Sequence, residues 1–100
     1  MSFMQKRYFV YILSNKKGGT LYVGVTGDHV RRVYEHKNKI VDGFSKQYNL
    51  SSLVYYECFD TAEEAIHREK CVKKWKRDWK ISRIYEFNPE WEDLYPRLTG

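Results

Sequence analysis

One acidic residue occupies a position where a helix would bury its apolar side. The apolar residues Ala62, Ala65, Ile66 and Val72 recur at helical spacing, and Glu69 lies in the middle of their stripe. A carboxylate at that position would face the core, where an unpaired polar group costs roughly 2–7 kcal/mol. Either a salt bridge to an interior arginine or a bound metal ion would offset this cost. The residues alone leave both open, and the salt bridge is the commoner solution.

Four further residues have side chains suited to phosphate chemistry. Arg32 and His36 are four positions apart, so they share one edge of a helix. Arginine can hold a phosphate with two hydrogen bonds, and histidine can donate to a phosphate or orient a water molecule. Tyr11 and Tyr22 fall on two neighbouring predicted strands, on faces that can be shared. Taken singly, such residues are more often solvated helix residues or core tyrosines with a bonded hydroxyl.

Basic residues concentrate in one short part of the chain. Residues 67–80 carry a net charge of +5 and include Trp75 and Trp79, whereas residues 84–100 carry −3. A basic face with exposed indoles would follow a phosphate backbone and stack on bases. The alternative is a solvated helix face whose tryptophans turn into the core. The candidate phosphate contacts are Arg31, Lys70, Lys73, Lys74, Lys76 and Arg77.

The elements that must position these residues follow from the periodicity of the chain. Asp28 and Thr61 are the expected helix caps, the second in a Thr-x-x-Glu capping box. After Pro89 an acidic, aromatic tail is expected to lie back on the domain. The expected order is strand, strand, helix, strand, helix, helix, which makes an α+β sandwich of an antiparallel sheet flanked by about three helices. The strands are predicted at 8–13, 20–25 and 53–59, and the helices at 29–39, 62–74 and 77–86.

Composition limits the class of protein. A chain of 100 residues with 42% hydrophobic residues and a net charge of +5 fits one folded domain. It shows no apolar run of about 20 residues for a membrane span and no signal peptide. Cys58 and Cys71 have neither the number nor the spacing of a disulfide scaffold or a zinc site. We therefore expect a soluble, cytoplasmic, single-domain protein that occupies residues 1–100.

The ordered set of these residues resembles the GIY-YIG nuclease domain, most closely its small stand-alone bacterial members. The first motif matches Phe9-Val10-Tyr11, with Phe where the name has Gly, and the second matches Tyr22-Val23-Gly24 about ten residues later. The catalytic arginine of the family matches Arg32, its helix partner matches His36, and its metal-binding glutamate matches Glu69. The resemblance covers about residues 7–94.

The resemblance implies a three-stranded antiparallel sheet and metal-dependent hydrolysis of a phosphodiester bond in DNA. In that scheme Glu69 is the sole protein ligand of Mg²⁺ or Mn²⁺, which suits an ion that keeps most of its water. Arg32 would stabilise the charge on phosphorus, and Tyr22 or Tyr11 would take a proton from the attacking water. An unperturbed phenol has a pKa of about 10, so this last role requires neighbouring positive charge.

Family members with defined targets carry additional DNA-binding modules, for which 100 residues leave no room. We therefore expect weak or structure-dependent cleavage of DNA, or of RNA, in a repair or recombination context, unless a protein partner or a homodimer supplies affinity. Two other classes compete with this prediction. One is a nucleic-acid-binding module that keeps the fold without the chemistry. The other is an interaction protein whose acidic tail and basic face pair between copies.

Overall fold

The structure, a computed structural model, describes residues 8–27 and 50–96 and contains five elements there. In chain order they are β1 (Tyr8–Ser14), β2 (Leu21–Thr26), β3 (Ser52–Phe59), α3 (Ala62–Lys74) and α4 (Arg77–Phe87). All five were predicted, each within one or two residues of its observed ends. The helix expected at 29–39 lies outside the described residues.

The three strands form one antiparallel sheet in the order β2-β1-β3. The central strand, β1, is an aromatic and β-branched run, and its residues from Val10 to Ser14 are buried. In the register of the sheet, Tyr11 lies opposite Gly24 on β2 and opposite Tyr56 on β3. The prediction of an α+β fold with an antiparallel three-stranded sheet is confirmed.

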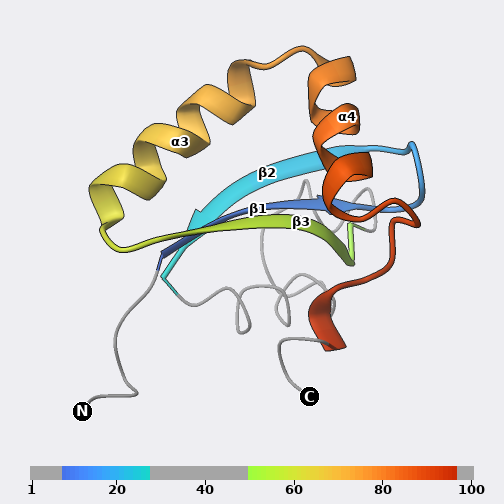
Figure 1. Cartoon of the computed structure of the whole chain (residues 1–100), viewed down its shortest axis with the longest axis horizontal. Helices are drawn as coiled ribbons and strands as arrows, with labels where there is room; N and C mark the ends of the chain where they lie inside the picture. Colours follow the sequence, from blue (N-terminus) through green and yellow to red (C-terminus); the bar gives the residue numbers. More distant parts are fainter. Residues whose placement is uncertain (1–7, 28–49, 97–100) are drawn as a thin grey trace.

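The two faces of the sheet pack against different parts of the chain. Figure 1 shows α3 and α4 on one side of the sheet, where Val10 and Ile12 of β1 join the cluster of Ala65, Val72 and Ile84. On the opposite face, alternate residues of β1 pack in a second cluster, which consists of Tyr11, Leu13, Leu50, Leu53 and Leu94 with Tyr22, Tyr56 and Tyr95 at its margin. Successive side chains of a strand point to opposite faces, so each strand contributes to both clusters.

Helix α3 begins at the predicted cap. The Thr61 Oγ1 accepts a hydrogen bond from the backbone N–H of Glu64 at 3.2 Å and donates one to the Glu64 carboxylate, also at 3.2 Å. Ala65, Glu69 and Val72 are the buried residues of this helix. Ile66 was predicted in the same stripe and this was wrong, since its side chain is 44% exposed. Ile66 lies 100° around the helix from Ala65, which places it at the margin of the buried stripe, beside Tyr8 and Val25.

The acidic tail lies back on the sheet, as predicted. The Leu94 backbone N–H donates to the Leu53 carbonyl at 2.8 Å, and the Leu53 N–H donates to the Asp93 carboxylate at 3.0 Å. The buried Asn88 side chain donates to the Val54 carbonyl at 3.2 Å. These bonds hold the tail along β3. Across the described ranges, neither helix combines the length and the apolar character that crossing a membrane requires.

Candidate active site

The motif residues of the first two strands come together on the face away from α3. The Tyr11 side chain is 1% exposed, and its ring lies 6.5 Å from that of Tyr22, centroid to centroid, with 32° between the planes. A Cβ added at Gly24 would lie 2.5 Å from both Cζ and Oη of Tyr11. The absence of a side chain at Gly24 therefore lets the Tyr11 phenol lie directly across β2.

Glu69 is buried, as the helical periodicity predicted, with 9% of the residue exposed. Its Oε2 lies 2.5 Å from Nζ of Lys73, one turn later on α3. Within the described residues, the ion-pair partner of Glu69 is thus a lysine of the same helix. The salt-bridge alternative expected an interior arginine, and Arg31 and Arg32 lie outside those residues. The Lys73 side chain is 56% exposed. Since its long stem can turn toward water, the carboxylate can exchange the ammonium for another cation without refolding.

A pocket of about 420 Å³ lies at the edge of the sheet, and it is lined by Tyr22 and by Lys73, the ion-pair partner of Glu69. Leu21, Tyr22 and Val23 of β2 line one wall, and Lys73 and Lys80 line the other. Because β2 is an edge strand, residues from both of its faces reach this pocket. The two lysines bring positive charge to the part of the β2 edge where Tyr22 lies, and positive charge is what an anionic phosphate requires. Lys80 was not among the predicted contacts.

The structure brings the predicted residues together in two groups. Tyr11, Tyr22 and Gly24 share one face of the sheet, and Glu69 lies over the opposite face with Ala65 and Val72. The groups meet at the β2 edge, where Tyr22 and Lys73 line the same pocket. Within the two described ranges, no group of three or more His, Cys, Asp or Glu side chains could hold a metal ion. The predicted Arg31, Arg32 and His36 lie outside those ranges.

The predicted phosphate contacts on the two helices are all exposed, and their binding role stays a prediction. Four of them project from the surface of α3 or its junction with α4: Lys70, Lys73, Lys74 and Lys76. Arg77 also has a structural role, because its Nη2 donates to the Gly18 and Gly19 carbonyls at 2.6 and 2.7 Å. These bonds attach the start of α4 to the β1–β2 turn and so fix the position of Lys80.

A second set of ionisable groups lies between β3 and α3, and the sequence analysis missed it. Arg68 donates to both carboxylate oxygens of Glu57, at 2.8 and 3.1 Å, and the Tyr55 hydroxyl donates to the same carboxylate. Burial favours a higher pKa for Glu57, but the hydrogen bonds from Arg68 and Tyr55 outweigh it, so the pKa lies below its usual value. Burial and the Glu57 carboxylate raise the pKa of Tyr55. A glutamate on a strand facing an arginine on a helix leaves no periodic signal that sequence could reveal.

Comparisons with known proteins show the family of this chain. Residues 7–82 match the family model of the GIY-YIG catalytic domain. The chain is 35% identical to a UPF0213 protein of Staphylococcus saprophyticus over 80 residues, which are 80% of this chain and 96% of that protein. It is 30% identical to a UPF0213 protein of Bacillus pumilus over 89 residues, covering 89% of this chain and 91% of that one.

A solved structure is similar over nearly the same length. The solution NMR structure of a UPF0213 protein from Bacillus halodurans superposes with a TM-score of 0.54 at 28% identity, covering 88% of this chain and 93% of that chain. The matched range of the family model, residues 7–82, contains Tyr11, Tyr22, Gly24 and Glu69. The chain therefore belongs to the GIY-YIG family of nuclease-type domains.

Proposed function

We propose that this chain is a metal-dependent endonuclease that hydrolyses phosphodiester bonds in DNA. The observation that carries the proposal is the packing of Tyr11 across Gly24 beside Tyr22, in a chain whose residues 7–82 match a catalytic domain. A tyrosine buried to 1% beside a second tyrosine could be plain core packing. Plain packing, however, gives no reason for the Tyr22 pocket to carry two lysines suited to a phosphate.

The donor set fits a divalent cation of the Mg²⁺ or Mn²⁺ type. Glu69 offers one carboxylate, held on a rigid helix and paired with a lysine that can withdraw. Mg²⁺ is typically held by one or two carboxylates and substrate phosphates and keeps several waters, so a single glutamate is sufficient. Glu69 would hold the cation, which when bound would stabilise negative charge on the leaving oxygen.

The residues of the chain divide the remaining work by their accessibility. Tyr22 is half-buried and is one of the residues that line the pocket, and in the proposed mechanism its hydroxyl would accept a proton from an attacking water. Tyr11 is enclosed and holds Tyr22 in place through their ring contact. Lys73 and Lys80 would hold the phosphate in the pocket. By the family resemblance, Arg32 would stabilise the charge that develops on phosphorus, and His36 would donate to the phosphate or orient the water.

The test is cleavage of branched, nicked and single-stranded DNA in Mg²⁺, in Mn²⁺ and in EDTA. We expect Glu69→Gln, which keeps the size of the side chain, to abolish metal-dependent cleavage. Tyr22→Phe keeps the ring and removes the proton acceptor, so cleavage should fall by roughly 10²–10⁴-fold. Glu63→Gln is the matched control, because Glu63 lies exposed in the first turn of the same helix. Cleavage by Glu69→Gln at the wild-type rate would refute the proposal.

A non-catalytic nucleic-acid-binding module is the second candidate. The ion pair between Glu69 and Lys73 favours it, since a carboxylate already neutralised by an ammonium needs no metal. Binding of DNA by the wild type without cleavage in either metal would establish this function. Cleavage only after addition of a protein partner, or only at concentrations that form a homodimer, would place the targeting outside one copy of the domain. If the wild type neither binds nor cleaves DNA, the result would favour the third class, an interaction protein.

A further inference from the structure

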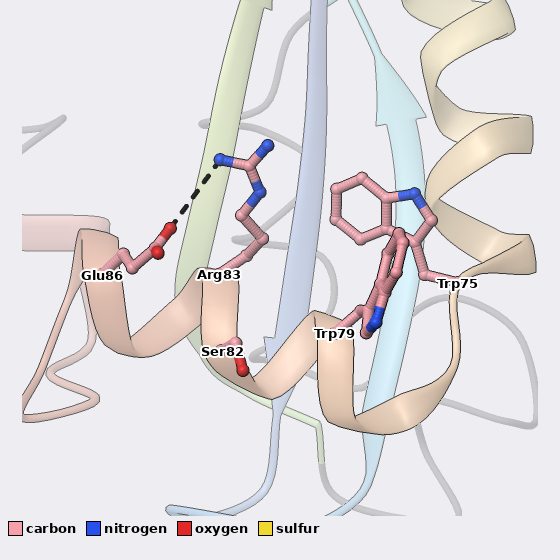
Figure 2. Close-up of a pocket in the computed structure, with 5 residues that line it drawn as sticks. All are labelled: Trp75, Trp79, Ser82, Arg83 and Glu86. Atoms are coloured by element: carbon pink, nitrogen blue, oxygen red, sulfur yellow. Dashed lines mark ion pairs between the residues drawn. The ribbon is translucent and has the colours of Figure 1, made fainter.

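The junction of α3 and α4 carries a second pocket, of about 400 Å³, on the outer side of α4. Figure 2 shows the indoles of Trp75 and Trp79 at one end, and Arg83 reaching toward Glu86 at the other, with an Nη1 to Oε1 distance of 3.8 Å. Ser82 completes the lining. Trp79 is 63% exposed. The alternative in which both tryptophans turn into the core is therefore wrong for Trp79, and its indole is available to another molecule.

The exposed indole is held in place by its neighbours. Trp75 packs edge-to-face against Trp79, with ring centroids 6.3 Å apart. Two guanidinium groups contact the Trp75 ring, Arg68 at 4.9 Å and Arg83 at 5.6 Å from its centroid. Arg68 is itself fixed by its two bonds to Glu57 on β3. This chain of contacts runs from the sheet to the surface, so Trp79 projects from a rigid support and loses little conformational freedom when a ligand binds.

The chemistry around the two indoles is that of a nucleobase site. An indole face stacks on any base, Arg83 can donate to base acceptors such as O6 and N7 of guanine, and Glu86 can accept from the exocyclic amine of a base. An adjoining pocket, lined by Lys74, Trp75, Lys76 and Trp79, adds two ammonium groups for the phosphates that flank the base. The charges of this surface are thus complementary to a nucleotide within a strand.

We infer that the Trp75–Trp79 pocket binds an unpaired base of single-stranded DNA. The bases of an intact duplex are stacked on one another and cannot present a face to Trp79, which excludes duplex DNA as the occupant. Lys80 follows Trp79 directly and lines the pocket of Tyr22. A strand anchored at Trp79 would therefore continue toward the candidate active site. Cleavage of the bound strand rests on the proposed function, but binding of the base needs no catalysis.

Binding is measured in EDTA, so that cleavage plays no part. A fluorescein-labelled single strand of mixed sequence and a blunt duplex of equal length are titrated with protein, with fluorescence anisotropy as the readout. We expect wild type to prefer the single strand and Trp79→Ala to weaken that binding by roughly 5- to 100-fold, the usual loss for one stacked base. Trp79→Phe keeps an aromatic face and should retain most of the affinity. Tyr85→Ala removes a comparably exposed aromatic of α4 outside the pocket and should bind as wild type.

Two results would overturn the assignment. One is a Trp79→Ala variant that binds the single strand as tightly as wild type, in which case the exposed indoles serve another partner such as a protein. The other is equal affinity of wild type for strand and duplex. The test is independent of the nuclease proposal, because Glu69→Gln should lose cleavage and still bind the single strand. A variant that loses cleavage but still binds the single strand would show that only the catalytic step is affected.

Discussion

The closest contact in the candidate active site gives the sharpest prediction. An alanine at position 24 would place its Cβ 2.5 Å from Cζ and Oη of Tyr11, whereas carbon atoms in contact prefer about 3.5–4.0 Å. The Tyr11 ring belongs to the central strand and is 1% exposed, so it cannot move aside into solvent. We expect Gly24→Ala to destabilise the protein by roughly 1–3 kcal/mol, in spite of the lower entropy of the unfolded chain with alanine.

The assay is urea unfolding of the single and double variants. With a slope of roughly 1–3 kcal/mol per M urea, the predicted loss moves the midpoint by roughly 0.3–3 M. Tyr11→Leu removes the atoms that clash, so Gly24→Ala should cost much less in that background. Gly27→Ala is the control, because its Cβ would meet a Tyr8 ring carbon at a milder 3.3 Å. An equal cost of Gly24→Ala with and without Tyr11→Leu would refute the packing argument.

Two further predictions concern the ion pairs of α3. The pKa of Glu57 is lowered from its ordinary value of 4.5. The ionised carboxylate therefore stabilises the fold fully above about pH 4.5, and this contribution is lost as the pH falls through the lowered pKa. Glu57→Gln should remove this pH dependence from the free energy of unfolding, measured in urea between about pH 3 and 7. Lys73→Met leaves the buried Glu69 carboxylate unpaired, so it should lower the Tm without metal, and Mg²⁺ should restore it. A higher half-saturating Mg²⁺ concentration for Lys73→Met than for wild type would contradict the exchange of cations at Glu69.

The sequence predicted the elements well because their signals are local. The capping box at Thr61 and the alternation in β2 each fix one end or one face of an element, and the structure confirms both. The burial of Glu69 followed from the same helical periodicity. Ile66 was placed wrongly because periodicity gives an angle around the helix and does not give the width of the surface that the sheet covers.

What could not be predicted depends on contacts between distant segments. Periodicity assigns Tyr22 and Glu69 to inward faces, but it does not say that they lie on opposite faces of the same sheet. The bonds from Arg77 to the β1–β2 turn join residues nearly 60 positions apart. The exposure of Trp79 has the same origin. Trp75 already fills the space over Arg68, so the second indole is left at the surface.

The edge position of β2 decides how a site with residues on both faces of a sheet can act on one bond. A phosphate over the middle of either face would meet Tyr11 and Tyr22, or else Glu69, but not both groups. At the β2 edge, the same phosphate would reach Tyr22 from one face and the Glu69–Lys73 pair from the other, with Lys80 beside it. In the proposed nuclease, a substrate strand would therefore cross this edge. Since α4 places Trp79 next to Lys80, a strand held by base stacking at the junction of the helices would follow that path.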